Sequence, residues 1–329
     1  MRMRRTLAYF VFACCVLLFV VKNRAAEVGG AVRSGDWTLS KTEDAGKVMF
    51  SMIEHHHGGN SNHQSTWPAS SFQGVDFSKA GRQDVHFTIV RDAGKIDCEG
   101  FLRDGEGAGL FHFQPDPNYP RAMQSLGFPV VNNGDKDNDG DRDNDKQFSM
   151  AVMDVTLEFA KQMKNEHLSG LDTDKLIAFR IFGVDSAFID GLRAEGLKVS
   201  DADKLVAFRI HGVSAQMVRS LHQAGYSPDE DTLIAMRIHG ATPEWVEQLK
   251  KLGYDHVDLE KLIAFRIHGV SPEFIQKVES LGYSHPEPDD LIAMRIHNVT
   301  PEYIADMKAR GIHDLSIDKL VSMRIHGID

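Results

Sequence analysis

The chain is poor in cysteine, because its 329 residues include only three. Cys14 and Cys15 lie inside an apolar N-terminal run, which leaves Cys98 for the rest of the sequence. A single thiol cannot form an intrachain disulfide, so the stability of the fold must come from packing. Cys98 alternates in phase with Ile96, and we expect it to be a small buried hydrophobic residue and not a reactive thiol.

An excess of positive charge is also absent, since 37 Lys and Arg stand against 47 Asp and Glu, for a formal net charge of −10. Nucleic-acid phosphates require a basic surface, so no nucleic acid is expected as a partner. The chain contains no HExxH motif, no glycine-rich phosphate loop and no convincing Ser/His/Asp set. Ser316 and Lys319 form an SxxK pair, but no KTG motif accompanies it. These absences predict a protein that is not an enzyme and that, calcium aside, has no cofactor.

One long uncharged run, residues 6–21, follows the basic sequence MRMRR at the N-terminus. The run is long for a signal peptide and short of the about 20 residues that a membrane span needs. A cleaved signal peptide and an uncleaved anchor, within residues 1–26, therefore both remain open. Positive charges are more frequent before the run than after it, which places the remainder outside the cytoplasm. We expect a secreted or periplasmic protein, or one anchored to the inner membrane by this segment.

Alternation of apolar and polar residues dominates residues 37–113, with glycine-rich breaks between the alternating segments. This pattern predicts a small antiparallel β-domain over residues 35–128, ending in a short helix that Gly127 terminates. The sequence IDCEGFLRDGEGAGLFHF predicts a hairpin around its glycine-rich turn. Residues 129–147 follow as an acidic, Asp-rich linker.

A repeated motif occupies residues 148–329, and its clearest form is KLIAFRIHGV at residues 261–270. The leucine of this motif returns in six clear copies, at spacings of 28 or 29 residues, and AVMDVTLEFAKQM matches as a degenerate copy before them. A fixed period of this size is typical of a solenoid of stacked units. Each copy has cap residues for two short helices. The expected fold class is therefore α+β: a small antiparallel β-domain followed by an α-solenoid of 28–29-residue helical hairpins.

An arginine occupies the same position in all six clear copies: Arg180, Arg209, Arg237, Arg266, Arg295 and Arg324. On a helical projection, Ile263, Phe265 and Ile267 define an apolar arc, and Arg266 falls within it. A guanidinium keeps its charge and must find acceptors there. Carbonyls at a neighbouring helix C-terminus are better candidates than the glutamates of the Pro-Glu pairs. We expect structural arginines that fasten each hairpin to the next; a ligand-binding ladder is the alternative.

A histidine follows the arginine by two positions in five copies, outside the apolar arc: His211, His239, His268, His297 and His326. These residues should form a stripe on one surface. Stacked helices lie about 8–10 Å apart, whereas the ligands of one zinc ion approach it to about 2.1 Å. We therefore interpret the stripe as helix-end histidines in favourable contact with the helix dipole. The alternative is a partner-binding or pH-sensitive surface.

A histidine-rich segment, EHHHGGNSNH, contains enough ligands for one zinc ion in His55, His56, His57 and His63. These residues are expected at a strand end and in a glycine-rich turn, which leaves their geometry unconstrained. A polar loop and a metal site both remain open.

The Asp-rich linker contains DKDNDGDRD, which has the DxDxDG spacing of a calcium loop. Its candidate ligands are Asp135, Asp137, Asp139 and Asp143. Position 12 of an EF-hand would be Lys146 in place of a glutamate. Calcium binding and a solvated acidic linker are therefore both open.

The repeat LIA(F/M)RIHGV(S/T)PE(F/Y/W), closing on LGY, resembles the tandem helical repeats behind the membrane part of some BlaR-type sensor metallopeptidases and in related secreted bacterial proteins. The stretch HFTIVRDAGKIDCEGFLRDGEGAGLFHFQPDP, with WTLS at residue 37, is similar to the segment that precedes those repeats. This sequence lacks their multi-span membrane domain, their HExxH motif and a penicillin-binding domain, so no proteolytic activity carries over. The resemblance implies an accessory extracytoplasmic module.

These patterns together predict a non-enzymatic extracytoplasmic scaffold that binds a protein or a cell-envelope component and is accessory to envelope signalling. An extended array presents a long surface without requiring a catalytic pocket. Two alternatives stay open: a metal-dependent hydrolase built on the 55–63 loop, and a calcium-stiffened spacer protein. The membrane is expected as a partner only through the N-terminal segment.

Overall fold

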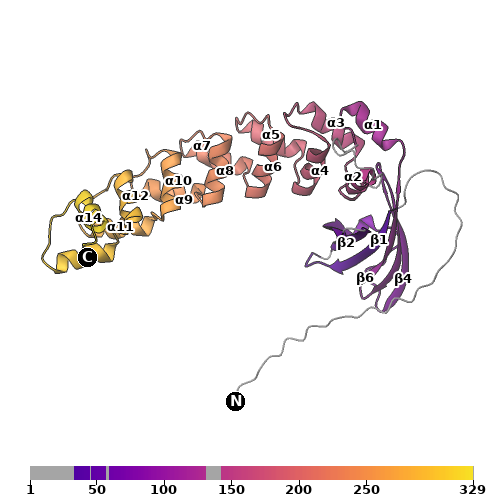
Figure 1. Ribbon diagram of the computed structural model, residues 1–329, viewed down its shortest axis with the longest axis horizontal. Helices are drawn as coiled ribbons and strands as arrows, with labels where there is room; N and C mark the ends of the chain where they lie inside the picture. The colour runs from indigo at the N-terminus through magenta and orange to yellow at the C-terminus, as the bar shows by residue number, and fades with distance from the viewer. Residues whose placement is uncertain (1–32, 45, 57–58, 131–141, 329) are drawn as a thin grey trace, which may run out of the picture. The chain divides into compact units, whose positions relative to one another are not determined.

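A six-stranded antiparallel sheet forms the first part of the structure (Figure 1). The computed structural model describes residues 33–44, 46–56, 59–130 and 142–328. The strands are β1 (Arg33–Lys41), β2 (Lys47–His56), β3 (Gly59–Pro68), β4 (Arg82–Arg91), β5 (Gly94–Arg103) and β6 (Glu106–Pro115). Their order is β3-β2-β1-β6-β5-β4. Strand β1 therefore lies between β2 and β6 and joins the β2–β3 hairpin to the β4–β6 strands.

The glycine-rich hairpin predicted from the sequence is confirmed as β5–β6, in which Arg103 pairs with Glu106. Its turn residues, Asp104 and Gly105, have φ values of 55° and 83°. Both values lie in the left-handed region, which glycine and aspartate tolerate better than most residues. The turn chemistry therefore sets the register of this hairpin.

Strand β3 corrects the sequence-based prediction of a polar loop around the histidine-rich segment. Its sequence, GNSNHQSTWP, is almost entirely polar, yet it pairs with β2 from His56–Gly59 to Lys47–Pro68. An edge strand bonds a neighbour on one side only, and its polar side chains can face water. The period-two apolar signal is therefore missing from a strand of this kind.

One face of the sheet carries the core of the β-domain. Trp37, Phe50 and Phe87 are at most 3% exposed, and their ring centroids lie 5.3–6.3 Å apart. Cys98 lies on the same face and is fully buried. Burial raises the pKa of its thiol. The expectation of a buried cysteine is confirmed.

Helix α1 (Tyr119–Leu126) follows the sheet and ends at Gly127, whose φ of 94° is left-handed, as predicted. The hydroxyl of Tyr119 is buried and donates a hydrogen bond to the carbonyl of Val155 at 2.7 Å. This bond fixes α1 against the loop that precedes helix α3 (Leu157–Asn165).

Helix α2 (Arg142–Val152) begins inside the segment that the sequence analysis assigns to the acidic linker. Its Phe148 is stacked on Phe111 of β6 with ring centroids 5.4 Å apart. The amide of Gln147 donates hydrogen bonds to the carbonyls of Ala93 and Asp116, each at 2.8 Å. Helix α2 therefore packs directly on the buried face of the sheet.

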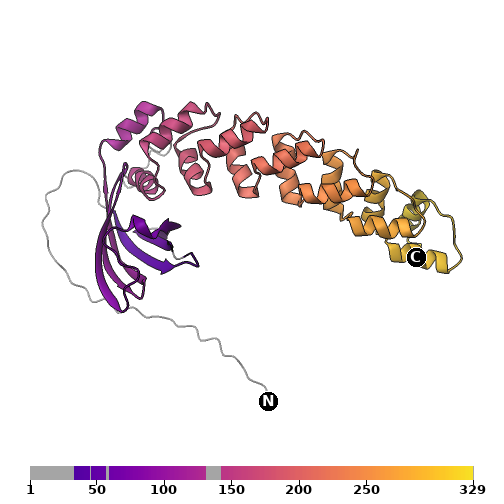
Figure 2. The ribbon, with the colours of Figure 1, turned by 180° about the vertical axis from the view of Figure 1, so that it is seen from behind.

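Two kinds of short helix alternate through the rest of the chain. The first helices of the six clear copies are α4 (Thr173–Phe182), α6 (Ala202–His211), α8 (Glu230–His239), α10 (Leu259–His268), α12 (Pro288–Ile296) and α14 (Ile317–Ile325). The second helices are α3 (Leu157–Asn165), α5 (Ser186–Ala194), α7 (Ala215–Gln223), α9 (Pro243–Lys251), α11 (Pro272–Ser280) and α13 (Pro301–Ala309). Consecutive first helices pack side by side, and so do consecutive second helices such as α5 and α7. The two rows of short helices run along the array in Figure 2. The α+β fold with a helical repeat array is confirmed.

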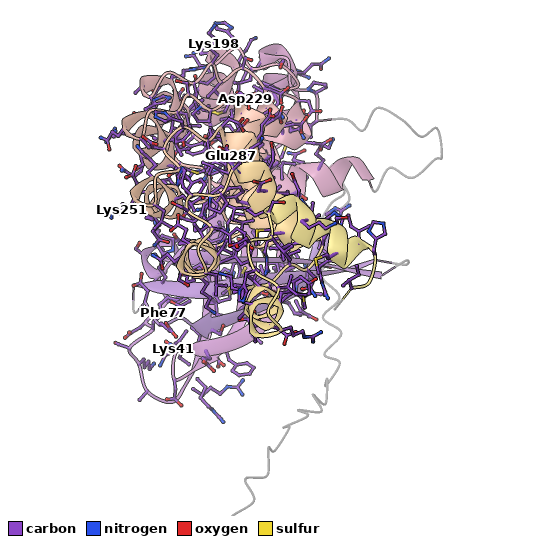
Figure 3. The ribbon with its side chains drawn as sticks, turned by 90° about the vertical axis from the view of Figure 1, so that its left-hand side faces the viewer. Lys41, Phe77, Lys198, Asp229, Lys251 and Glu287 are labelled. Carbon is purple, nitrogen blue, oxygen red and sulfur yellow. The ribbon has the colours of Figure 1, made fainter. Side chains whose placement is uncertain are left out.

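The predicted helix caps are present in almost every copy. Side chains that accept a hydrogen bond from the first turn of a first helix belong to Asp172, Asp201, Asp229, Asp258 and Ser316. Glu287 precedes α12 without such a bond; it and Asp229 are labelled in Figure 3. Left-handed residues with φ of 56–74° follow the first helices, namely Gly183, Gly212, Gly240, Gly269 and Asn298. These local signals fix where each helix begins and ends.

The repeated arginine joins each first helix to the preceding copy. The Nε atoms of four arginines donate to backbone carbonyls 26 or 27 residues earlier, at 2.8–3.4 Å: Arg180 to Met153, Arg237 to His211, Arg266 to His239, and Arg295 to His268. Carbonyls at or just beyond a helix C-terminus lack an intrahelical partner. The expectation of carbonyl acceptors is confirmed for these four arginines.

The arginine also lies over a ring from the preceding second helix. Five such pairs have 3.8–5.2 Å between Cζ and the ring centroid: Arg180–Phe159, Arg209–Phe188, Arg266–Trp245, Arg295–Phe274 and Arg324–Tyr303. A guanidinium in this position is attracted to the face of the ring. Gly240 permits the close approach, because a Cβ atom there would lie 2.9 Å from Nη2 of Arg266.

The predicted burial of the arginines is wrong. Arg266 is exposed, as are three of the other arginines, and the remaining two are half-exposed. The buried side of the helix is narrower than the predicted arc, because Leu262 and Phe265 are fully buried but Ile267 is 53% exposed. The arginine therefore runs along the edge between two copies and keeps part of its guanidinium in water.

The second helices are joined by comparable contacts. Nζ of Lys250 donates to the carbonyl of Ala224, near the end of the preceding second helix, at 2.9 Å. The hydroxyl of Tyr254 reaches the carbonyl of Pro286 in the next copy at 2.8 Å. Each copy therefore supplies donors that satisfy carbonyls of its neighbours.

Arg266→Lys should lower the free energy of unfolding by about 1 kcal/mol. A lysine ammonium cannot both bond the His239 carbonyl and lie flat on the Trp245 ring, as the planar guanidinium does. Urea denaturation of the full chain measures the change. Arg121→Lys, at an exposed position of α1, is the matched control and should change nothing. A variant at position 266 as stable as the parent would contradict this role.

Candidate binding surface

Six isoleucines at one repeat position are exposed on the first helices: Ile181, Ile210, Ile238, Ile267, Ile296 and Ile325. Each is between 53% and 58% exposed. A single exposed isoleucine is ordinary, but the same exposure in six adjacent copies forms a row of apolar surface. We call this set the isoleucine strip.

A second apolar residue lies one helical turn before the strip isoleucine in each copy. In α10 it is Ile263, which is 9% exposed and belongs to the hydrophobic core. The other copies have a half-buried isoleucine or valine at this position: Ile177, Val206, Ile234, Ile292 and Val321. These residues pack against the hydrophobic core, so the exposed apolar surface of each first helix comes mainly from its strip isoleucine.

The predicted histidine stripe borders the isoleucine strip at the C-terminal ends of the first helices. His239 and His326 are exposed, and His211, His268 and His297 are half-exposed. Phe182, which is 40% exposed, takes the position in the first clear copy. The histidine border is predicted from the sequence, whereas the apolar surface beside it is not. The available signal was the isoleucine itself, which is unchanged in all six copies.

Ion pairs between copies form the opposite border, at the N-terminal ends of the first helices. They are Lys146–Asp174, Lys175–Asp203, Lys204–Asp231 and Lys261–Asp289. Hydrogen bonding to Asp289 raises the pKa of Lys261, so this lysine is charged at neutral pH. Exposed ion pairs contribute little to stability. Their main effect is that the charges of these lysines and aspartates offset one another.

Of the four histidines predicted to bind zinc, only His63 has a described side chain. His55 and His56 end β2 and His63 lies in β3, whereas His57 and the side chains of His55 and His56 lie outside the described residues. Within the described ranges, no group of three or more His, Cys, Asp or Glu side chains could hold a metal ion. The zinc site stays a prediction.

His63 instead contacts a buried ion pair. Nη1 of Arg33 donates to Oε1 of Glu54 at 2.9 Å, and both side chains are at most 6% exposed. Nε2 of His63 lies 3.8 Å from the other carboxylate oxygen of Glu54, with its ring edge-on to Phe148. This cluster joins β1, β2 and β3 beneath α2.

Two further predicted features lie outside the described residues. Asp135, Asp137 and Asp139 belong to residues 131–141, and for Asp143 only the backbone, in α2, is described. Calcium binding therefore stays a prediction. The targeting segment, residues 1–26, is likewise not described; in the described part of the chain, no helix is both long and apolar enough to cross a membrane.

Comparison with protein-family models, curated proteins and solved structures finds no match to this chain. The resemblance of the repeats to those of sensor metallopeptidases rests on the sequence motif alone. The proposed function therefore rests on the geometry of the isoleucine strip and its two borders.

Glu54→Gln should destabilise the protein by roughly 3 kcal/mol near neutral pH, because it leaves the buried Arg33 without this carboxylate. Burial acts to raise the pKa of Glu54, but hydrogen bonds from His63 and Arg33 outweigh it and hold the pKa below the ordinary 4.5. Because the pKa of Glu54 is lowered in the folded state, its carboxylate contributes its full stabilisation above pH 4.5. This stabilisation is lost as the pH falls through the lowered pKa.

Urea denaturation over a range of acidic and neutral pH tests this expectation. The stability difference between parent and Glu54→Gln should shrink below pH 4.5. The control is Glu99→Gln, at an exposed position of β5, with little effect at any pH. A difference that does not vary with pH would show that the charge of Glu54 is not responsible.

Proposed function

We propose that this chain is a non-enzymatic scaffold that binds a protein of the cell envelope through the isoleucine strip. The observation that supports it most is the equal exposure of 53–58% at six equivalent isoleucines. A solenoid helix needs one apolar side for packing, and Leu262 and Phe265 already supply it in α10. The six strip isoleucines lie outside the described hydrophobic core. Covering it with a partner would stabilise the complex by about 25 cal/mol per Å² of apolar surface.

An extracytoplasmic setting is part of the proposal. The basic MRMRR sequence and the uncharged run at residues 6–21 support export or anchoring. The resemblance of the repeats to those behind sensor metallopeptidases supports an accessory role in envelope signalling. In this role the array presents a long surface, and no catalytic residue is required.

Metal content separates the scaffold from the hydrolase alternative. A hydrolase built on the 55–63 segment requires stoichiometric zinc that His56→Ala and His63→Ala would remove. The scaffold is expected to contain no stoichiometric zinc. Elemental analysis of the purified full chain, after dialysis against a zinc-containing buffer and then a zinc-free buffer, decides between them.

A variant with Ile238→Ser, Ile267→Ser and Ile296→Ser should lose its partner while it keeps its fold. The three side chains are more than half exposed, so together they should change stability by only about 1 kcal/mol. The measurement is capture from envelope extract with immobilised parent or variant, quantified by mass spectrometry.

The control for capture replaces exposed apolar residues of the sheet, Val90→Ser and Leu110→Ser, which are 63% and 50% exposed. A protein retained by the parent and by this control, but not by the isoleucine variant, supports the scaffold. Equal capture by all three chains would rule out the isoleucine strip as the binding surface.

A further inference from the structure

A lysine directly before the repeat leucine pairs with an aspartate of the next copy at three junctions between first helices. These lysines are Lys175 in α4, Lys204 in α6 and Lys261 in α10. Two other first helices lack a lysine at this position, because α8 has Thr232 and α12 has Asp290. At the junction of α12 with α14, an acid therefore replaces the cation of the repeated ion pair.

A pocket of about 330 Å³ lies at this junction. Three carboxylates line it: Glu287 and Asp290 from the start of α12, and Asp318 from the first turn of α14. Tyr283 and Ile317, both half-buried, also line the pocket and give it an apolar wall. No lysine or arginine is among its lining residues, all of which the structure describes. The pocket is therefore negatively charged.

The carboxylates of the pocket destabilise one another. Burial, and then the charges of Asp318 and Glu287, raise the pKa of Asp290. The ammonium of Lys261 in the preceding copy is engaged elsewhere, since it donates a hydrogen bond to Asp289 at 2.8 Å. A cation that entered the pocket would relieve this repulsion.

Glu287 departs from the repeat at the same junction. The other first helices of the clear copies begin with a capping aspartate or serine, whereas no hydrogen bond joins the side chain of Glu287 to the first turn of α12. Two repeat positions, those of Glu287 and Asp290, thus differ from the other copies, and both side chains line the one pocket.

The other junctions show which group fits against these acids. Nζ of Lys261 lies 2.8 Å from Asp289, whose position in the repeat is that of Asp318. An ammonium has three donors for carboxylate oxygens, and the methylene stem behind it packs along apolar surface such as Tyr283 and Ile317. Within the described ranges, no group of three or more His, Cys, Asp or Glu side chains could hold a metal ion. An organic cation therefore suits this pocket better than a metal ion.

We infer that the pocket between α12 and α14 binds an alkylammonium group, which takes the place of the lysine that Asp290 replaces. The ammonium bonds Asp290 and Asp318, and its alkyl chain lies along Tyr283 and Ile317. Such a group belongs either to a lysine side chain of a partner polypeptide or to a free amine. The pocket lies at the N-terminal ends of the first helices, at the border opposite the histidines, so this inference does not rest on the proposed function.

Two-dimensional NMR of the isotope-labelled full chain tests the inference through the backbone amides of Ser284 and Ser316, which line the pocket. The probe is n-butylamine, which has the length and charge of a lysine side chain, and n-butanol is its uncharged control. We expect saturable shifts of both amides with n-butylamine and none with n-butanol.

Asp290→Lys places an ammonium of the chain itself in the pocket. It should weaken binding of n-butylamine at least about tenfold and leave the unfolding curve at least as stable as that of the parent. Thr232→Lys adds the same charge at the other junction that lacks the lysine, and it is the matched control. At physiological ionic strength charges are screened over about 8 Å, so this control should keep the affinity of the parent. Asp318→Asn should also weaken binding, and it serves as a second test should Asp290→Lys fail to fold.

Three outcomes would overturn the inference: equal affinity of the parent and Asp290→Lys for n-butylamine, equal shifts with n-butanol, or calcium that shifts the same amides at lower concentration than the amine. N-acetyl-lysine methylamide distinguishes the two sources of the ammonium. Binding at least as tight as that of n-butylamine assigns the pocket to a lysine side chain, and binding of n-butylamine alone assigns it to a free amine.

The variant Ile238→Ser, Ile267→Ser and Ile296→Ser should bind n-butylamine as the parent does. Loss of partner capture by this variant and loss of amine binding by Asp290→Lys are therefore separate results. If the amine does not bind but capture still requires the isoleucines, this inference fails and the proposed function stands.

Discussion

The interaction on which the array depends is the donation of cationic side chains to carbonyls at the end of a neighbouring helix. A short helix leaves its last carbonyls without intrahelical partners. Here the next copy supplies the donor, through Arg266 to His239 in the row of first helices and through Lys250 to Ala224 in the row of second helices. A single hairpin does not contain these donors, so each hairpin is stabilised by its neighbours in the stack.

The same interaction leaves the outer side of the first helices available for function. Leu262 and Phe265 face the interior, and Arg266 occupies the edge toward the preceding copy. The outer side is then free of structural constraints, and a polar residue there would be harmless to the fold. An isoleucine at this position in all six copies is therefore a feature that packing of the described fold does not explain, and it is the basis of the proposed binding role.

Local chemistry made much of this structure predictable from the sequence. Asp258 as a cap and Gly269 as a left-handed terminator fix a helix within ten residues, and the 28–29-residue spacing repeats that helix through the array. The error at Ile267 arose because a helical projection gives the direction of a side chain but not the width of the buried arc. Strand β3 was missed because its side chains are polar, and the Arg33–Glu54 pair because it depends on the pairing of strands.

The central claim, that the strip isoleucines face water while the leucines of the same helices are buried, can be measured through thiol reactivity. Ile267→Cys and Leu262→Cys are made separately in the full chain, and maleimide labelling of each site is followed by peptide mass spectrometry. The buried Cys98 serves as an internal standard for protection. We predict that a cysteine at 267 reacts at a rate close to that of a free peptide thiol, while 262 and Cys98 react only on unfolding. Protection at 267 equal to that at 262 would contradict the account.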